Sequence, residues 1–178
     1  MDKGFVVWLT GLPASGKTTV AVDLEKKLRD KGKRVEVMDG DEVRKGLSRD
    51  LGFSKEDREI HAMRVAYVSK LLSRNGVAVI VALISPYRSF RQAIREDIED
   101  FVEVFVRCPV DECAKRDPKG LYAKALAGEI KDFTGVDDPY EDPENPELIL
   151  DTFTEETSES VARVLDWLAA HGYLDGTG

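Results

Sequence analysis

The sequence predicts an α/β fold of the three-layer αβα type, with a mostly parallel five-stranded central sheet and a lid. Short apolar runs alternate with longer segments of helical period, which is the pattern of a parallel sheet covered by helices on both faces. A stretch rich in Gly, Pro, Asp and Glu, residues 133–146, interrupts this alternation and has the character of a functional lid. Ligands bind beyond the carboxyl ends of parallel strands, so we expect function in the loops that follow the strands.

Length and composition fit one domain over residues 1–178. The chain has a formal net charge of −8, which argues against general binding to nucleic acid or to an anionic membrane. We find no apolar stretch long enough for a membrane span and no secretory leader before the first strand. The two cysteines, Cys108 and Cys113, match no zinc spacing. A cytoplasmic protein with reduced, buried thiols is therefore expected.

The first strand and helix are the best defined elements. Phe5–Thr10 is a continuous apolar run rich in β-branched and aromatic residues, which predicts a strand buried on both faces. The glycine-rich segment Gly11–Gly16 ends that strand. The next segment, Lys17–Lys31, has the period of an amphipathic helix that stops at Gly32. Its apolar positions follow one another at steps of four: Val20, Leu24 and Leu28.

A second strand and a long helix follow. Arg34–Met38 is the strand, and it leads into Asp39-Gly-Asp41. Lys55–Arg74 is the helix, with Ser54 as its expected N-cap and Asn75-Gly76 as its stop.

The rest of the chain continues the alternation. The predicted strands are Val77–Ile84, Phe101–Val106 and Leu148–Leu150. The predicted helices are Arg88–Ile98, Pro109–Arg116, Leu121–Ala127 and Glu155–His171. The closing helix is amphipathic, and its apolar face carries Val161, Val164, Leu165 and Leu168.

The segment after the first strand matches the phosphate-binding pattern G-x-x-x-x-G-K-[ST], from Gly11 to Thr18. Glycines let backbone N–H groups approach phosphate oxygens, and the following helix directs its positive end at the same anion. Lys17 supplies a charge for the β and γ phosphates, and the Thr18 hydroxyl is suited to Mg²⁺. A glycine-rich turn that precedes Lys-Thr by chance is the alternative, but the flanking strand and helix favour a P-loop NTPase-type fold.

The P-loop does not by itself identify the reaction. A small GTPase would carry the guanine-reading pattern N-K-x-D, which is absent from the sequence. A motor ATPase would be longer, and it would end an apolar strand in a Mg²⁺-binding acid. The strand Val77–Ile84 instead leads into Ser85-Pro86. A kinase that acts on a small acceptor is favoured.

Asp39-Gly-Asp41 lies where the second strand ends, which is a position for catalysis in such a sheet. Two carboxylates there could orient an acceptor hydroxyl or hold magnesium through water. The alternative is a helix N-terminus that is capped by Asp41.

Arginines are dense after the second and third strands. Arg44 and Arg58 flank the aromatic Phe53, and arginines with an aromatic ring predict a clamp for a base that carries an anionic tail. A second group of arginines is predicted instead to lie on solvent-exposed helix faces, where acidic residues balance their charge: Arg64, Arg91 and Arg95.

Several motifs together resemble the adenylylsulfate kinase (APS kinase) family along nearly the whole chain. Beside the P-loop they are Asp39-Gly-Asp-Glu-Val-Arg-Lys-Gly-Leu47, Leu51-Gly-Phe53, Asp57-Arg58, Ile84-Ser-Pro-Tyr-Arg88, Arg116-Asp-Pro-Lys-Gly-Leu-Tyr122, Ala127-Gly-Glu-Ile130 and Phe133-Thr-Gly-Val136. The P-loop is common to many families, whereas this combination is far more specific.

The resemblance implies transfer of the γ-phosphate of ATP to adenosine 5′-phosphosulfate, with Mg²⁺, as a step of sulfate assimilation. It implies ATP contacts at Gly11, Leu12, Pro13, Ala14, Ser15, Gly16, Lys17, Thr18, Thr19 and Arg116. It implies acceptor contacts at Asp41, Arg44, Phe53, Arg58, His61, Ile84, Ser85, Lys119 and Phe133. The expected catalytic residues are Lys17, Asp39, Asp41 and Ser85, and the expected metal ligand is Thr18. A homodimer is also implied, as is functional coupling to an ATP sulfurylase.

Ser85 and His61 each have more than one possible role. The family serine that matches Ser85 has been treated as a phosphoserine intermediate, but the sequence offers no evident base to activate it, and direct transfer is favoured. His61 stands where many members have Asn. It could bind as a neutral group, carry a charge at low pH, or be a helix-face residue without a role.

Two other functions stay open at this point. The first is a different P-loop kinase, such as a nucleoside monophosphate kinase. The second is a non-catalytic nucleotide-binding regulatory protein, against which the intact Lys17, Thr18, Asp39 and Asp41 speak.

Overall fold

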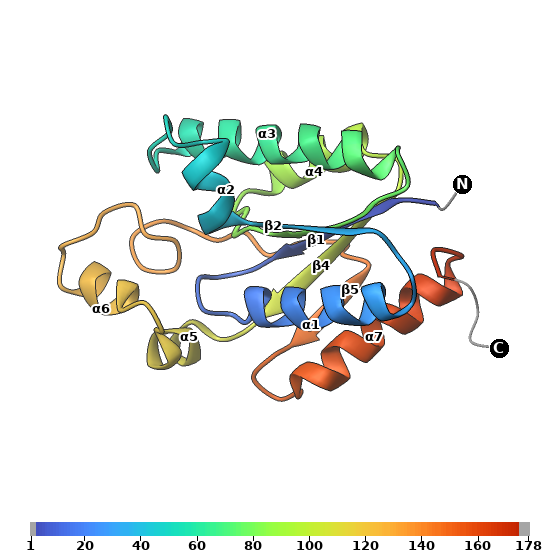
Figure 1. Ribbon diagram of the computed structural model, residues 1–178. Coiled ribbons are helices and arrows are strands. Elements are labelled where there is room, and N and C mark those ends of the chain that lie inside the picture. The colour runs from blue at the N-terminus through green and yellow to red at the C-terminus, as the bar shows by residue number, and fades with distance from the viewer. Residues whose placement is uncertain (1–2, 175–178) are drawn as a thin grey trace.

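The computed structural model describes residues 3–174 and contains a sheet of five parallel strands (Figure 1). The strands are β1 Phe5–Thr10, β2 Val35–Asp39, β3 Ala78–Ala82, β4 Phe101–Arg107 and β5 Leu148–Asp151. Their order across the sheet is β2-β3-β1-β4-β5, so β1 is central and its loop lies between those of β3 and β4. The predicted α/β fold with a parallel five-stranded sheet is confirmed.

β1 is apolar along its whole length because both of its faces are covered. Phe5, Val7 and Leu9 pack into one core cluster, while Val6 and Trp8 pack into another on the opposite face. Side chains alternate between the two faces of a strand, so a central strand has no polar side to expose. Burial of both faces fixes the register of β1 against β3, in which Val6 is opposite Val79.

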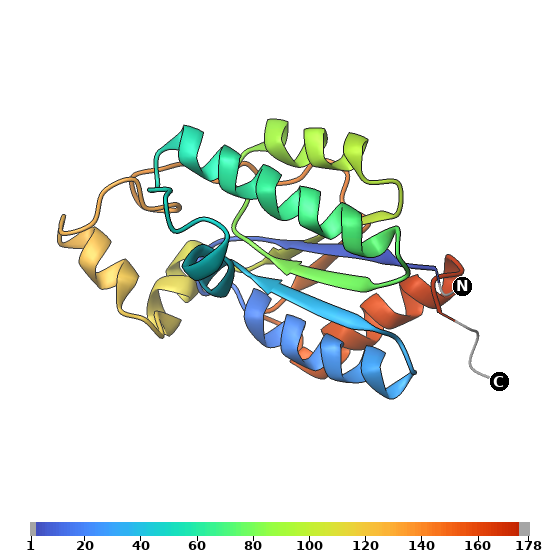
Figure 2. The same ribbon diagram turned by 45° about the horizontal axis from the view of Figure 1, so that its top comes forward.

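Seven helices occur within residues 3–174. They are α1 Lys17–Asp30, α2 Gly40–Gly46, α3 Lys55–Ser73, α4 Arg88–Asp97, α5 Val110–Arg116, α6 Leu121–Leu126 and α7 Thr157–Ala170. Helices α1 and α7 cover one face of the sheet, and α3 and α4 cover the other (Figure 2). The short helices α2, α5 and α6 stand near the carboxyl edge (Figure 1).

The lid, residues 133–146, is irregular as predicted. Its only regular pairing among the described residues is an isolated bridge between Thr134 and Asp138. It runs from α6 back along the carboxyl edge to β5 (Figure 1).

Helix starts follow the expected capping chemistry, with one correction. The Ser54 hydroxyl accepts a hydrogen bond of 3.1 Å from the Asp57 amide, which confirms Ser54 as the N-cap of α3. At α2 the predicted alternative, a cap by Asp41, is wrong. Asp39 is the N-cap, and its carboxylate accepts from the Asp41 amide at 3.1 Å. The chain leaves the strand at Asp39 in an extended conformation, which is the geometry that an N-cap requires.

Among residues 3–174, no helix combines the length and the apolar character that a membrane crossing requires.

Candidate active site

The P-loop, Gly11–Thr18, leaves β1 and turns directly into α1. Gly11 has to be glycine, because a Cβ there would lie 2.4 Å from the Val106 carbonyl oxygen. Gly16 has a φ of 103°, in the left-handed region, and it is the residue from which α1 begins. The loop therefore brings its backbone close to β4 and presents the positive end of α1 at the carboxyl edge.

Lys17 folds back over the P-loop. Its Nζ donates to the carbonyl oxygens of Gly11 and Leu12, at 2.9 and 2.7 Å. Burial of the ammonium lowers the pKa of Lys17 to about 8, because the charged form loses its hydration. The lysine is thus held at the phosphate-binding loop by acceptors that carry no full charge.

Thr18 and Asp39 join the P-loop to the end of β2. The Thr18 hydroxyl donates to the Asp39 carboxylate at 2.8 Å. A hydroxyl beside a carboxylate is a hard-oxygen donor pair of the kind that binds Mg²⁺, which keeps most of its waters in such sites. Within the described part of the chain there is no group of three or more His, Cys, Asp or Glu side chains that could hold a metal by itself.

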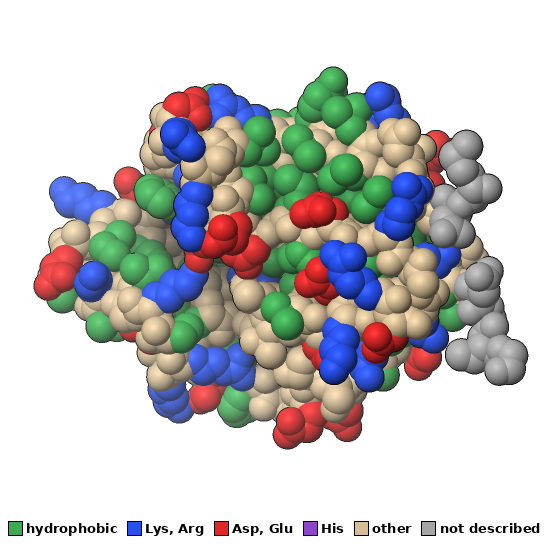
Figure 3. Space-filling model, viewed as in Figure 1, with side chains coloured by type: hydrophobic (Ala, Val, Ile, Leu, Met, Phe, Trp, Pro, Cys, Tyr) green, Lys and Arg blue, Asp and Glu red, His purple; other side chains and the backbone are tan. Residues whose placement is uncertain are grey.

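Asp41 forms an ion pair with Lys119, which lies between α5 and α6. Both side chains are largely exposed, so the pair lies at the mouth of the site. Acidic and basic side chains lie side by side over α2 in Figure 3. Residues far apart in the sequence thus meet at this edge.

The aromatic and arginine residues predicted as a clamp lie together. The Arg44 guanidinium stands 4.3 Å from the centre of the Phe53 ring, and it donates to the Gly52 carbonyl at 2.9 Å. The Phe53 ring is 62 % exposed, so it offers a free apolar face at the surface. Arg58 donates to the Phe53 carbonyl at 2.9 Å and is the third member of this group.

Arg58 also binds the lid. Its guanidinium donates to the Thr134 hydroxyl at 2.5 Å and to the Asp132 carbonyl, and it lies 3.2 Å from the Asp138 carboxylate. The fork of an arginine allows these contacts at the same time. Arg58 therefore connects α3 to the lid, which was not expected from the sequence.

Phe133 lies inside the lid and is only 9 % exposed. Its ring packs edge-on against Tyr122 at 5.0 Å, and the Tyr122 hydroxyl donates to the Pro13 carbonyl at 2.8 Å. Phe133 is thereby linked to the P-loop. Among the described residues, the rings of Phe53 and Phe133 do not contact each other.

Ser85 is buried behind the loop that follows β3. The Trp8 indole donates to its hydroxyl at 2.8 Å, and the hydroxyl donates to the Leu83 carbonyl at 3.2 Å. The preceding carbonyl, of Ile84, accepts from the Thr10 hydroxyl at 2.6 Å. The only titratable side chain that hydrogen-bonds Ser85 in the described region is Arg91, which donates to the carbonyl oxygen of Ser85 and is no base.

His61 is buried in α3, at 4 % exposure, and so does not lie on the solvent-exposed face of that helix. Its Nδ1 lies 2.8 Å from the Ser48 hydroxyl, while its Nε2 is buried without a hydrogen-bond partner. Burial, followed by the nearby charges of Arg44 and Arg64, lowers the pKa of His61 to about 4. His61 is therefore neutral at pH 7, and it would carry a charge only at low pH, near 4 or below.

The second group of arginines has separate outcomes. Arg64 pairs with Asp50 at the surface, at 2.7 Å, as expected for a solvated helix face. Arg95 pairs with Glu147 at 2.6 Å. Arg91 corrects the prediction, since it is 2 % exposed and makes buried contacts instead of facing solvent. Helical spacing could not show this, because the partners of Arg91 come from other segments.

Arg116 lies beside the P-loop. It donates to the Thr152 carbonyl at 2.7 Å, and the Thr152 hydroxyl donates to the Ser15 carbonyl at 2.5 Å. Sequence reasoning missed Thr152, for which the only signal was its place directly after β5. A neighbouring cavity of about 310 Å³ is lined by residues that include Leu12, Pro109 and Phe153.

Comparisons with known proteins agree over nearly the whole chain. The family model described as Adenylylsulphate kinase matches residues 3–151. A probable adenylyl-sulfate kinase of Synechocystis sp. is 54 % identical over 175 residues, which cover 98 % of this chain and 99 % of that one. A probable bifunctional SAT/APS kinase of Sorangium cellulosum is 53 % identical, over 98 % of this chain and 30 % of that one.

A solved structure shows the same similarity. It is the Mycobacterium tuberculosis APS kinase in complex with AMPPNP and APS, which is 46 % identical to this chain. The two structures superpose with a TM-score of 0.91, over 94 % of this chain and 99 % of that one.

Proposed function

The chain belongs to the adenylylsulphate kinase family, and we propose that it transfers the γ-phosphate of ATP to the 3′-hydroxyl of adenosine 5′-phosphosulfate. The products are ADP and 3′-phosphoadenosine 5′-phosphosulfate. The observation that carries this proposal is the hydrogen bond between Thr18 and Asp39, at 2.8 Å. It brings the P-loop together with the carboxylate segment at the end of β2, where phosphate donor and acceptor hydroxyl have to meet.

On the donor side, ATP takes the P-loop from Gly11 to Thr19. Backbone N–H groups and the start of α1 bind its phosphates, and Lys17 adds a full positive charge. In the free protein that charge is held by the Gly11 and Leu12 carbonyls, so phosphate oxygens are stronger partners for it. Arg116, beside Ser15 and Thr152, is suited to the nucleoside end of ATP.

Thr18 and Asp39 would hold Mg²⁺, Thr18 through its hydroxyl and Asp39 through its carboxylate. Both are hard oxygen donors, and their contact of 2.8 Å fits a shared site. The ion, when bound, supplies positive charge to the β and γ phosphates of ATP.

On the acceptor side, Asp41 is the residue that we assign to the 3′-hydroxyl. A carboxylate there accepts a hydrogen bond from the hydroxyl and orients its oxygen for in-line attack. Lys119 forms an ion pair with Asp41 in the free protein, and its ammonium would move to the anionic tail of the acceptor when the acceptor binds. Ile84 would contact the nucleoside, and Phe53 would stack on the adenine while Arg44 reaches the phosphosulfate.

Arg58 and Phe133 act from the lid side of the acceptor. Arg58 bonds to Thr134 and lies beside Asp138, so it holds the lid close to α3. Phe133 anchors the same lid against Tyr122. We assign His61 an indirect part, since its neutral ring supports Ser48 behind the clamp.

Transfer is direct, without a phosphoserine. The Ser85 hydroxyl is engaged by the Trp8 indole and the Leu83 carbonyl, and neither group removes a proton. In-line transfer needs positioning and charge neutralisation, which the P-loop and Asp41 supply. Ser85 instead shapes the backbone on which Ile84 is presented.

A homodimer is part of the proposal, and α3 supplies its interface. An apolar stripe on α3 is exposed or half-buried at helical spacing: Ile60, Met63, Tyr67 and Leu71. Green side chains gather over this helix in Figure 3. Glu56 and Arg74 lie at the two ends of the stripe. In an antiparallel pairing of two copies, each Glu56 would therefore meet an Arg74.

Coupling to an ATP sulfurylase and a cytoplasmic location complete the proposal. An ATP sulfurylase is the enzyme that would form the acceptor, adenosine 5′-phosphosulfate. The Sorangium cellulosum relative, described as a bifunctional SAT/APS kinase, is consistent with such coupling. Cys108 and Cys113 are both free and buried, which suits a reducing compartment.

The test is release of ADP from ATP and Mg²⁺, with adenosine 5′-phosphosulfate and AMP compared as acceptors. We expect turnover with the phosphosulfate and little with AMP, because Arg44 and Lys119 favour the longer anionic tail. Turnover with AMP alone would assign a different acceptor to the site. Absence of turnover with both would refute a kinase of either nucleotide.

A further inference from the structure

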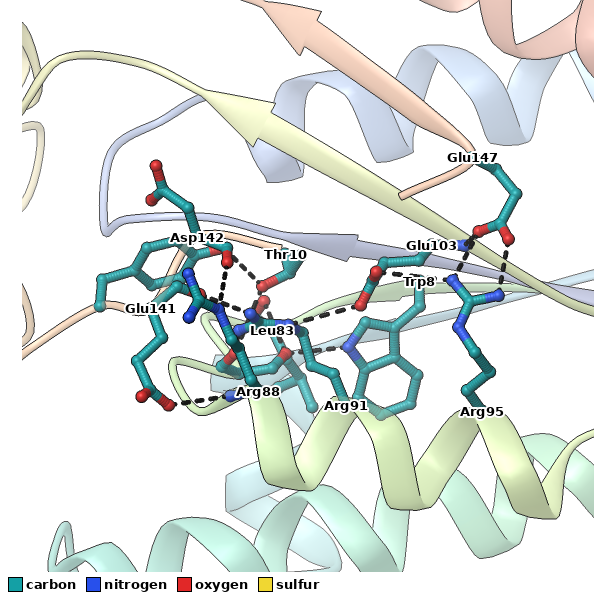
Figure 4. Close-up of polar contacts among 12 residues, drawn as sticks. Trp8, Thr10, Leu83, Arg88, Arg91, Arg95, Glu103, Glu141, Asp142 and Glu147 are labelled. Carbon is teal, nitrogen blue, oxygen red and sulfur yellow. Dashed lines mark hydrogen bonds and ion pairs between the residues drawn. The ribbon is translucent and has the colours of Figure 1, made fainter. Parts of the chain in front are cut away.

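Arg91 lies at the centre of a buried polar network (Figure 4), and no step of the proposed reaction has so far given it a role. It projects from α4 and is only 2 % exposed. Its Nη1 donates to the Ser85 carbonyl at 2.5 Å, its Nη2 donates to the Glu141 carbonyl, and its Nε lies 3.4 Å from the Glu103 carboxylate. One side chain thus joins the loop after β3, the lid and β4.

The first segment that Arg91 holds is the β3 loop, residues 83–87. Ser85 has a φ of 46°, a left-handed conformation that is unfavourable for a residue with a Cβ. Such a conformation persists only when surrounding contacts hold it. Here the Trp8 indole binds the Ser85 hydroxyl at 2.8 Å, and Arg91 and Thr10 bind its carbonyl.

The second segment is the lid stem, residues 140–142. The Glu141 amide donates to the Pro86 carbonyl at 2.8 Å, so the stem is bonded directly to the β3 loop. The Tyr140 hydroxyl hydrogen-bonds the Thr10 hydroxyl at 2.8 Å, and the Tyr140 ring stacks on Phe105. Arg88 adds a bond of 2.7 Å to the Asp142 carbonyl. The lid is therefore anchored at the β3 loop.

The charge of Arg91 is balanced by a shared carboxylate. Glu103 on β4 faces Arg91 at 3.4 Å and Arg95 at 3.5 Å, and Arg95 in turn pairs with Glu147 at 2.6 Å. Arg91 and Arg95 are one helical turn apart on α4 and use the same carboxylate. Of these two arginines, however, only Arg91 hydrogen-bonds the β3 loop and the lid stem, whereas the side-chain partners of Arg95 are Glu103 and Glu147.

We propose that Arg91 is a positioning residue, whose planar fork sets the β3 loop and the lid stem in one fixed relation so that the acceptor nucleotide is bound. The inference rests on the proposed function for its substrate. Three separate acceptors around one guanidinium require the fork geometry. Lysine would keep the charge but could not reach all three. The ATP site lies on the P-loop, which Arg91 does not touch, so the donor should be unaffected.

The experiment compares Arg91→Lys with Arg95→Lys as a matched control on the same helix and the same carboxylate. For Arg91→Lys we expect the KM of the acceptor to rise roughly tenfold, while the KM of ATP changes by less than about twofold. Arg95→Lys should leave both KM values within about twofold of wild type. Equal changes in the two KM values, or equal behaviour of the two variants, would overturn the proposal.

Hydrogen exchange of the Glu141 amide gives a second readout that does not depend on the acceptor. This amide is bonded to Pro86, so its exchange should accelerate in Arg91→Lys and not in Arg95→Lys. The same exchange rate in both variants would overturn the inference even if the enzyme were active. If exchange accelerated only in Arg91→Lys and the enzyme did not phosphorylate adenosine 5′-phosphosulfate, the coupling of the β3 loop to the lid stem would be supported. Only the assignment of the substrate would then be refuted.

Should Arg91→Lys fail to fold, Arg88→Ala tests the same connection from the surface. Arg88 is exposed, and its side chain donates to the Asp142 carbonyl of the lid stem and pairs with Glu144 further along the lid. Arg88→Ala should also raise the acceptor KM, by a smaller factor than Arg91→Lys. An unchanged acceptor KM in Arg88→Ala would contradict the coupling of stem and loop.

Discussion

At the scale of single residues, burial decides the protonation of the groups around the site. Lys17 and His61 are both enclosed, and in both the charged form is disfavoured because it loses water. The two residues differ in the partners that offset this loss of hydration. The Lys17 ammonium donates to backbone carbonyls and lies at the phosphate-binding loop. His61 has one hydroxyl partner, and its Nε2 has no hydrogen-bond partner. Lys17 therefore keeps a functional charge, and His61 does not.

Removal of the Lys17 charge should nearly abolish transfer. In Lys17→Ala we expect kcat to fall by roughly two to three orders of magnitude, because the charge acts on phosphate oxygens most strongly in the transition state. ADP release at saturating acceptor is the measurement, with circular dichroism to check folding. Wild-type turnover in a folded variant would contradict the assignment of the P-loop.

The pKa of Lys17 also predicts proton uptake on nucleotide binding. With a pKa of about 8 the amine is mostly neutral at pH 9, and anionic phosphates should restore its charge. Calorimetry with a non-hydrolysable ATP analogue, in buffers of different ionisation enthalpy, should show protons taken up at pH 9 and few at pH 7. Lys17→Ala is the control and should show no such difference.

His61 should make the fold sensitive to acid. Its pKa of about 4 in the folded protein is below the ordinary value of 6.5, so the unfolded chain binds more protons between these two values. Stability should therefore fall as the pH drops from 6.5 towards 4, by about 2 kcal/mol for this residue. In His61→Asn this part of the loss should be absent from urea unfolding curves measured at pH 7 and pH 4.5. An identical pH dependence in both proteins would contradict a neutral, buried His61.

At the scale of elements, the end of β2 and the start of α2 show how one residue serves structure and chemistry. Asp39 ends the strand, caps the helix through the Asp41 amide and accepts from Thr18 on α1. The cap holds α2 at the carboxyl edge, and α2 carries Asp41 and Arg44 into the site. A change at Asp39 therefore has two separable consequences.

Replacement of Asp39 by Asn and by Ala should separate its role as a helix cap from its role in the reaction. Asparagine caps a helix as well as aspartate, so Asp39→Asn should keep the wild-type stability, while activity falls roughly a hundredfold or more because the carboxylate is lost. Asp39→Ala should show the same loss of activity and, in addition, lose about 1 kcal/mol of stability. Urea denaturation together with ADP release distinguishes the two effects. Equal stability of Asp39→Asn and Asp39→Ala would exclude a capping role.

At the scale of the whole molecule, the sheet brings distant segments to one edge and leaves α3 exposed on the outside. The loops of β1, β2 and β3 all emerge at the carboxyl edge because every strand runs parallel. The lid crosses that edge and is held at one end by Arg58 and at the other by Arg91. The stripe on α3 lies on the layer that is turned away from α1 and α7, where a second copy could cover it.

A charge in that stripe should prevent dimerisation. For Tyr67→Asp we expect a shift from dimer to monomer in sedimentation equilibrium, because a carboxylate would have to lose its water against apolar side chains. Val22→Asp on α1 is the matched control, since Val22 is as exposed as Tyr67 but lies on the opposite layer. A wild-type protein that is monomeric, or a dimer that tolerates Tyr67→Asp, would refute this interface.

The sequence by itself determined the layers, the P-loop and the family. Local pattern was sufficient for these features. A strand that is covered on both faces has to be apolar throughout, as Phe5–Thr10 is. A phosphate-binding loop needs Gly11, Gly16 and Lys17 at fixed spacing. Ser54 was predictable for the same reason, since its cap bond joins residues three apart.

Only the tertiary structure decided the roles of Arg91, Arg58 and His61. The partners of Arg91 come from β4, the β3 loop and the lid. The partners of Arg58 in and beside the lid, Asp132, Thr134 and Asp138, lie 74 to 80 residues further along the chain. No helical period reveals such contacts, so Arg91 and Arg64 had the same pattern although one is buried and the other pairs at the surface. Burial is a property of what packs against a residue, and for these side chains the packing partners are distant in sequence.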